Sequence, residues 1–176
     1  MNKTTAKQEI IKYLKIHGIH YHLFNEEGGF VSADKIDTVL FSVPLDEVFG
    51  RRLETTIRFR DEHMYCMTYP AQPTVEPENE DQEMRCTRIL NYINGELHFE
   101  SDLLYDHKMV LLSDTGDVYN GFHVRYEVFE ENFDNTMACI MDIPPQLFAH
   151  VYPAIFFYVK GEIEFDKAVE IVKESP

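Results

Sequence analysis

Cysteine is scarce in this chain, and its spacing excludes several kinds of site. The three cysteines, Cys66, Cys86 and Cys139, are odd in number and far apart, and none belongs to a Cys-x-x-Cys pair. The sequence therefore indicates neither a zinc site nor a thiol redox motif of that kind. We expect three reduced thiols used in packing, which is typical of a reducing compartment.

Long apolar runs are also missing. No run approaches the roughly 20 residues that a membrane-spanning helix needs. Residues 1–5 lead directly into a helical pattern, without the apolar core of a signal peptide. We therefore expect a cytoplasmic protein.

Basic residues are few: 16 Lys and Arg stand against 31 Asp and Glu, for a net charge of −15. Nucleic-acid binding depends on basic side chains that neutralise phosphates, so this balance disfavours nucleic acid and, for the same reason, an anionic membrane surface. The balance fits a basic protein partner or simple solubility.

Motifs that carry catalysis or bind cofactors are absent. The chain has no Gly-x-Ser-x-Gly, no Walker loop and no Gly-x-Gly-x-x-Gly. Gly28 and Gly29 precede a strand pattern, whereas a phosphate cradle needs the N-terminus of a helix. We expect a protein that is not an enzyme, and we assign no catalytic, cofactor-binding or metal-binding residue and no cofactor.

Local patterns predict a single α+β domain over residues 1–176. Helical spacing of apolar residues predicts helices over 4–17, 84–94, the region from 142 to 161, and 165–173. Thr5 and Gln8 form a plausible capping box for the first helix, and Gly18 suits its left-handed end. β-rich or alternating stretches predict strands over 19–24, 36–43, 53–60, 64–69, 97–103, 108–112 and 118–129.

The connections are predicted from turn residues. A turn is expected at 25–29 and one helical turn at 45–52. Three prolines and five acidic residues in 70–83 predict a solvated loop inside the domain. Gly95 is expected to end the second long helix.

The most regular stretch is 114–161. Residues 114–117 predict a turn, and the strand 118–129 then alternates, with Tyr119, His123, Arg125 and Phe129 on one face. Acidic residues at 130–134 break the pattern. Asp142 is a plausible N-cap, and Pro153 is expected to kink or split the helix that follows.

Residues 84–161 resemble the YbjN-like family, which shares its fold with the type III secretion chaperones. The resemblance lies in the order of elements. A helix ends at residues 93–95, a strand follows from Leu97, and the turn 114–117 leads into the strand 118–129. A helix containing residues 151–155 comes last.

The resemblance implies an antiparallel sheet flanked by helices, in the approximate order α-β-β-β-α-β-β-α with a short C-terminal helix. It further implies a non-enzymatic domain that binds protein chains in a chaperone-like or regulatory manner, as a homodimer. It carries no catalytic signature, so no site residue is transferred to this chain.

Histidines offer an alternative function. His20 and His22 lie two residues apart on a predicted strand and so point to one face, a geometry that metal sites use. No Cys, Asp or Glu stands at a fixed spacing as a third ligand. The alternatives are exposed strand histidines or a small metal-binding or ligand-sensing protein that uses His20 and His22.

Acidic pairs and aromatic rows have less specific interpretations. Pairs such as Glu130 and Glu131 fall in turns, where carboxylates are solvated. Residues 114–117 resemble part of a calcium loop but lack its terminal Glu. Tyr119 and the row Tyr65, Met67 and Tyr69 are either the core of a sheet covered on both faces or an adaptable binding surface.

Overall fold

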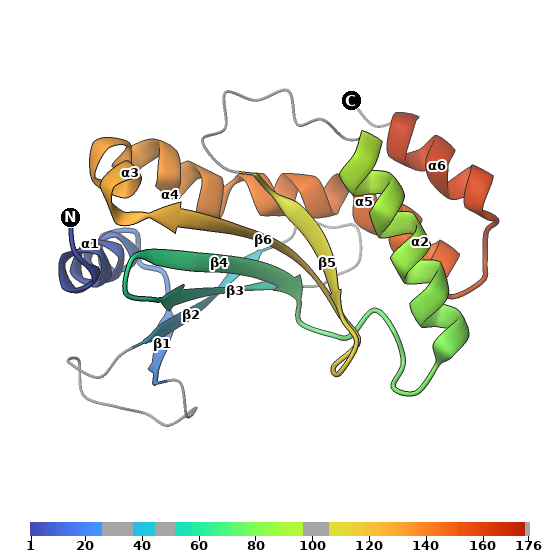
Figure 1. Cartoon of the computed structure of the whole chain (residues 1–176), viewed down its shortest axis with the longest axis horizontal. Helices are drawn as coiled ribbons and strands as arrows, with labels where there is room; N and C mark the ends of the chain where they lie inside the picture. The colour runs from blue at the N-terminus through green and yellow to red at the C-terminus, as the bar shows by residue number, and fades with distance from the viewer. Residues whose placement is uncertain (26–36, 45–51, 97–105, 175–176) are drawn as a thin grey trace.

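The computed structural model describes residues 1–25, 37–44, 52–96 and 106–174 (Figure 1). The elements, in chain order, are α1 (Lys3–Ile16), β1 (Tyr21–Phe24), β2 (Thr38–Pro44), β3 (Arg52–Phe59), β4 (His63–Pro70), α2 (Glu80–Glu96), β5 (Lys108–Leu112), β6 (Asp117–Arg125), α3 (Tyr126–Glu131), α4 (Phe133–Met141), α5 (Ile143–Val159) and α6 (Phe165–Glu174).

The strands form one antiparallel sheet in the order β1-β2-β3-β4-β6-β5. The expected α+β class, with helices flanking an antiparallel sheet, is therefore confirmed. The order of elements differs in detail from the expected one, because four strands precede α2 and two additional short helices follow β6. The predicted strand 97–103 lies outside the described residues, as do most of the turn at 25–29 and of the helical turn at 45–52.

The described helices pack toward one face of the sheet. Figure 1 shows α3, α4 and α5 along the sheet, α1 at one end and α2 and α6 at the other. Alternate strand residues such as Val39, Ile57 and Phe122 point into this layer and are at most 2% exposed. Two apolar clusters fill it, one around α1, α3 and α4 and one around α2, α5 and α6.

The opposite face of the sheet carries no described helix, and we call it the open face. The register of the strands places the remaining alternate residues there. One row across four strands joins Thr38, Arg58, Tyr65 and His123. The open face consists of the side chains of His22, Phe24, Thr38, Leu40, Ser42, Arg52, Glu54, Thr56, Arg58, His63, Tyr65, Met67, Tyr69, Lys108, Val110, Leu112, Asp117, Tyr119, Gly121, His123 and Arg125.

The first helix begins at a different cap from the expected one. The Oδ1 atom of Asn2 accepts a hydrogen bond from the N–H of Thr5 at 3.0 Å, so Asn2, and not Thr5, is the N-cap. This bond satisfies one of the N–H groups that the first turn leaves without a helical partner. Gly18 adopts φ +66° just after the helix, as its position predicted.

The predicted strand 118–129 is wrong in its last four residues. β6 ends at Arg125 and α3 begins at Tyr126. The hydroxyl of Tyr126 donates to the carbonyl of Arg60 at 2.6 Å, and Phe129 is fully buried against Phe133, with ring centroids 5.1 Å apart. A helix brings residues 126 and 129 to one side, whereas a strand would separate them.

The acidic break expected at 130–134 is also wrong, because α4 begins at Phe133. Its residues Met137, Cys139 and Ile140 are at most 3% exposed and join the cluster around α1. Further along, α5 follows directly and is not split at Pro153. Asp142 precedes α5 as predicted, but its side chain makes no capping hydrogen bond.

The connection 70–83 is less solvated than predicted. Thr74 and Val75 are 0% and 5% exposed, and their N–H groups both donate to the carbonyl of Gly116, at 2.9 and 3.0 Å. The helix α2 already begins at Glu80, and it continues through Gly95, which does not end it. The short helix predicted over 165–173 is confirmed as α6.

A buried histidine at the start of β5 makes folding stability depend on pH. His107 is 4% exposed, and its Nδ1 bonds to Oδ1 of Asn120 at 2.8 Å. Burial lowers the pKa of the His107 imidazole, while Asn120 and Asp106 act in the opposite direction. The unfolded chain therefore binds a proton near the ordinary histidine pKa of about 6.5, before the folded chain does.

We expect the free energy of unfolding to fall as the pH is lowered through that range, because the unfolded state then binds more protons. Urea denaturation at a series of pH values should show a smaller fall for His107→Gln than for the wild type. The exposed His17 supplies the control variant His17→Gln, which should keep the wild-type slope. Equal slopes for all three proteins would contradict the expectation.

Candidate functional site

Four aromatic side chains from two strands form a contiguous group on the open face. The strands β4 and β6 are 47 residues apart in sequence at their nearest ends but pair directly in the sheet. The rings of Tyr65 and His123 stack with centroids 4.3 Å apart, and the rings of His63 and His123 meet at 61° and 5.0 Å. The hydroxyl of Tyr65 donates to that of Tyr119 at 3.0 Å. We call these four residues the Tyr–His cluster.

The Tyr–His cluster depends on a glycine beneath it. A Cβ atom on Gly121 would lie 2.7 Å from both a ring carbon of Tyr119 and the hydroxyl oxygen of Tyr65. The side chains of the two tyrosines can therefore pack over the strand at Gly121 only because this position has no side chain. The pairing register of β6 continues past Gly121 without a bulge.

The electrostatics of the cluster favour neutral side chains. Burial, and then the hydrogen bond with Tyr119, raises the pKa of the Tyr65 phenol. Burial, with Glu54 as the next cause, raises the pKa of Tyr69 to about 12. Burial, and then the nearby His63, lowers the pKa of His123. Such groups suit hydrogen bonding and packing, whereas an activated phenol would need a lowered pKa.

Three arginines of the open face are exposed and carry their charge without an ionic partner. Arg58 lies opposite Tyr65, Arg125 lies opposite His63, and Arg52 lies near the far end of β3. None of the three makes a salt bridge within the described part of the chain. Lys108, the fourth basic side chain of the open face, pairs with Asp106 at 2.9 Å.

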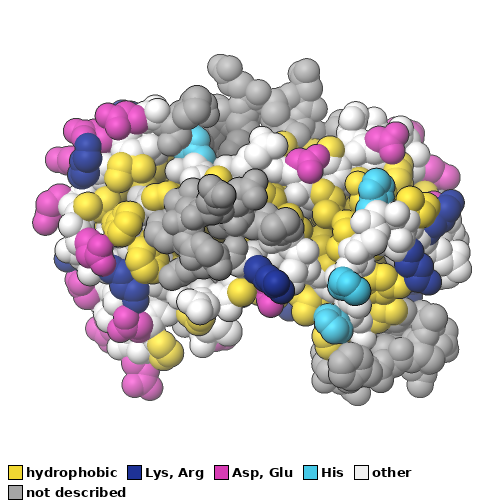
Figure 2. All heavy atoms as spheres, turned by 180° about the vertical axis from the view of Figure 1, so that it is seen from behind, with side chains coloured by type: hydrophobic (Ala, Val, Ile, Leu, Met, Phe, Trp, Pro, Cys, Tyr) yellow, Lys and Arg dark blue, Asp and Glu magenta, His cyan; other side chains and the backbone are white. Residues whose placement is uncertain are grey.

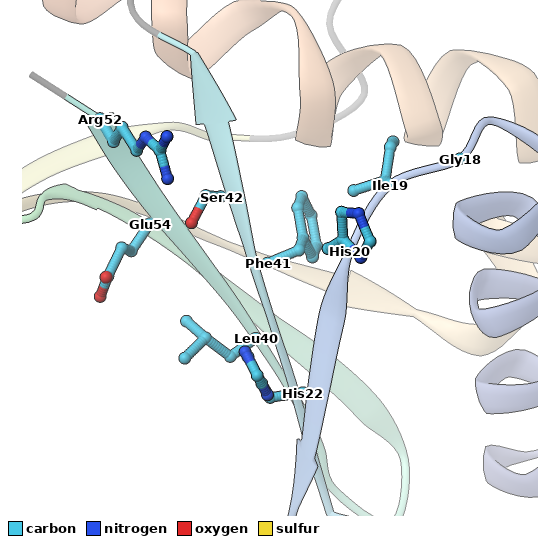
Figure 3. Close-up of a pocket in the computed structure, with 9 residues that line it drawn as sticks. All are labelled: Gly18, Ile19, His20, His22, Leu40, Phe41, Ser42, Arg52 and Glu54. Atoms are coloured by element: carbon cyan, nitrogen blue, oxygen red, sulfur yellow. The ribbon is translucent and has the colours of Figure 1, made fainter.

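A hollow of about 580 Å³ lies on the open face beside β1. His20 and His22 stand on one side of it, and Ser42, Arg52 and Glu54 stand on the other (Figure 3). The prediction that the two histidines share one side is thus confirmed. The other described residues that line the hollow are Gly18, Ile19, Leu40 and Phe41.

Two other histidines, His17 and His63, do not line this hollow. The ring of His17 lies beside that of Tyr13, with centroids 4.2 Å apart and planes tilted by 34°, and His63 belongs to the Tyr–His cluster. Across residues 1–25, 37–44, 52–96 and 106–174, no three His, Cys, Asp or Glu side chains form a group that could hold a metal ion.

The predicted aromatic rows divide between the open face and the core. Tyr119, His123 and Arg125 share the open face as predicted, whereas Phe129 is buried in α3. Tyr65 and Tyr69 lie half-buried, and Met67 is 6% exposed between them. The sequence could not reveal that His63 and Tyr65 lie beside His123, because no local pattern pairs β4 with β6.

Other sequence expectations are confirmed at single positions. The three cysteines are free and buried, and burial raises the pKa of each thiol. Residues 114–116 lie in the turn between β5 and β6, Asp117 is the first residue of β6, and the hydroxyl of Thr115 donates to the carboxylate of Asp117 at 2.6 Å. No helix in the described part of the chain has the length and apolar character to cross a membrane.

Comparison of the chain with protein-family models, with curated proteins and with solved structures found no match.

Proposed function

We propose that this protein is a non-enzymatic domain that binds other protein chains, in a chaperone-like or regulatory manner, and that the open face is its contact surface. The observation that carries the proposal is the set Tyr65, Met67, Tyr69 and Tyr119, which lie together on a sheet face that no described helix covers. Tyr65 and Tyr69 are half-buried there, whereas Met67 and Tyr119 are only 6% and 8% exposed. Tyrosine, methionine and arginine are enriched at protein interfaces. Methionine also adapts its shape to different partners.

The remaining parts of the proposal come from the sequence. The resemblance to the YbjN-like family supports a homodimer and a chaperone-like role. Three cysteines that are free and buried support a cytoplasmic location. An extended chain laid on a sheet face would gain both apolar contact and hydrogen bonds from the tyrosine hydroxyls.

The test is affinity capture with a variant of the open face. In Tyr65→Ser/Tyr69→Ser, two half-buried aromatic side chains are shortened while the helix-covered face is untouched. A buried tyrosine at an interface typically contributes about tenfold or more to affinity. We therefore expect partners recovered with wild-type protein from gentle lysates to be lost with this variant.

The control is Ile16→Ser/Met84→Ser, which removes two apolar side chains that are 70% and 66% exposed on α1 and α2. This control should recover the same proteins as the wild type. If the open-face variant recovers them equally well, the contact surface lies elsewhere. If wild-type protein recovers no partner, the chaperone-like proposal fails.

The hollow at His20 and His22 favours a second candidate, a small metal-binding or ligand-sensing protein. Metal analysis of purified protein and a thermal-shift screen of small anions distinguish it from the first. Stoichiometric zinc or nickel, or a shift in melting temperature with an anion, should disappear in His20→Ala/His22→Ala. Both should persist in His17→Ala, because His17 does not line the hollow. That result would replace the protein-binding proposal.

A further inference from the structure

The charge of the open face has the opposite sign to that of the whole chain. The open face carries four basic side chains, Arg52, Arg58, Lys108 and Arg125, and two acidic ones, Glu54 and Asp117. The whole chain has 16 basic and 31 acidic residues. On the face seen in Figure 2, acidic side chains are most numerous at the end of the molecule that carries α2 and α6.

Two of these arginines flank the Tyr–His cluster. Arg58 is on β3 and Arg125 is on β6, with β4 between them. Neighbouring strands lie about 4.8 Å apart, and Arg125 is displaced from Arg58 by two residues along the strands, so the backbones at the two arginines are about 12 Å apart. The stacked rings of Tyr65 and His123 and the ring of His63 fill the space between them. The result is an aromatic platform with a guanidinium on either side.

Within the described part of the chain, these guanidinium groups remain without an ionic partner, although the chain is rich in carboxylates. Arg58 and Arg125 are exposed and form no salt bridge within the described residues, whereas Lys3, Lys160 and Lys167 each pair with a carboxylate. An arginine presents a planar group of donors that binds a carboxylate through two parallel hydrogen bonds. Carboxylates of another molecule would give each of the two guanidinium groups an ionic partner.

We propose that the open face binds a short, extended, acidic segment of a partner protein, with carboxylates on Arg58 and Arg125 and apolar groups over Tyr65 and His123. The inference rests on the protein-binding function proposed above and names the chemistry of the partner. An extended chain rises about 3.3 Å per residue and alternates its side chains, so residues four apart share one face and span about 13 Å, close to the separation of the arginines. The expectation of a basic partner then applies to the acidic end at α2 and α6, and not to the open face.

A nucleic acid fits this arrangement less well than a peptide. Its phosphates continue beyond the open face at a spacing of a few ångströms and would meet the repulsion of a chain with net charge −15. A peptide can carry its carboxylates only where the arginines lie. The aromatic platform also suits the apolar side chains that a peptide places between its acids.

Fluorescence anisotropy with two labelled peptides of about 12 residues, each spanning about 40 Å when extended, tests the inference. One has Glu at every fourth position with Tyr, Leu and Ser between, and the other has Gln in place of Glu. We expect the Glu peptide to bind, with affinity that falls as salt is added, and the Gln peptide to bind at least tenfold more weakly. In Arg58→Glu/Arg125→Glu, loss of two charge-assisted contacts should weaken the Glu peptide by about 100-fold.

The matched control is Lys12→Glu/Lys15→Glu, which changes the net charge by the same amount on the exposed side of α1. Its affinity for the Glu peptide should stay within a few-fold of the wild type. Equal weakening in both double variants would mean general electrostatics and would overturn the inference. Competition by single-stranded DNA at lower concentration than by the Glu peptide would overturn the choice of a peptide.

The two proposals fail in different ways. Suppose that the Gln peptide binds as well as the Glu peptide, and that only Tyr65→Ser/Tyr69→Ser abolishes this binding. The open face then binds protein chains but does not select acidic ones. If neither peptide binds and the lysate capture also yields nothing, both proposals fall.

Discussion

Replacing Phe148 by alanine is expected to lower the free energy of unfolding by about 3–5 kcal/mol. Phe148 is 0% exposed on α5, and its ring meets that of Tyr152 at 65° with centroids 5.9 Å apart. Removing the ring loses the free energy gained by its transfer out of water. It also leaves a cavity that the neighbouring side chains cannot fill completely. The position matters because α5 packs against α2, α4 and α6.

Urea denaturation followed by circular dichroism gives the measurement, with Phe156→Ala as the matched control on the same helix. Phe156 is only partly buried and packs at the margin of the same cluster. Its loss should therefore cost clearly less than the loss of Phe148. Equal costs would show that α5 is not anchored through Phe148.

The second large effect is expected at Gly116, in the turn between β5 and β6. Gly116 has φ +72°, and a Cβ atom there would lie 2.1 Å from the carbonyl oxygen of Val75. Gly116→Ala must therefore push away the segment whose Thr74 and Val75 N–H groups donate to the Gly116 carbonyl. Losing these two hydrogen bonds and adopting an unfavourable φ together cost about 3–5 kcal/mol.

Gly18→Ala separates the two causes of this loss. Gly18 has a similar φ of +66°, but a Cβ atom there would meet nothing within 4 Å. Its substitution should cost only the backbone contribution, about 1–2 kcal/mol. Limited proteolysis should in addition cut Gly116→Ala within residues 70–79 faster than Gly18→Ala. Similar stability of the two variants would contradict the contact with Val75.

The parts of the fold that could be predicted are those specified by neighbouring residues. In β3, Leu53, Thr55, Ile57 and Phe59 alternate with Thr56 and Arg58, and the four are at most 1% exposed. A period of two over eight residues has only one consistent interpretation. The helix α6 was predictable for the same reason, because its apolar residues repeat at a helical period.

The prediction failed where one local pattern fits two structures. Val124, Tyr126 and Val128 continue the alternation of β6, yet the chain turns into α3 after Arg125. The bond from Tyr126 to the Arg60 carbonyl and the packing of Phe129 on Phe133 decide the outcome. These contacts join parts of the chain that a local pattern cannot compare.

The candidate site, too, could be predicted only in the part that a local pattern specifies. Which residues of β6 share a face followed from alternation, so Tyr119, His123 and Arg125 were grouped correctly. Their neighbours Tyr65, His63 and Arg58 come from β3 and β4, and only the order of strands in the sheet brings them together. That order is set by burial of the whole helix-covered face and by long-range pairing.

The pairing of β4 with β6 at the middle of the sheet also affects the order in which a nascent chain can fold. The hairpin of β3 and β4 can form as soon as residues 52–70 are available, because its contacts are local. Until residues 117–125 have been synthesised, β4 remains an unpaired edge that carries Tyr65, Met67 and Tyr69. An apolar edge of this kind readily pairs with other chains. The ribosome-bound intermediate is therefore the form of this protein that is most exposed to aggregation.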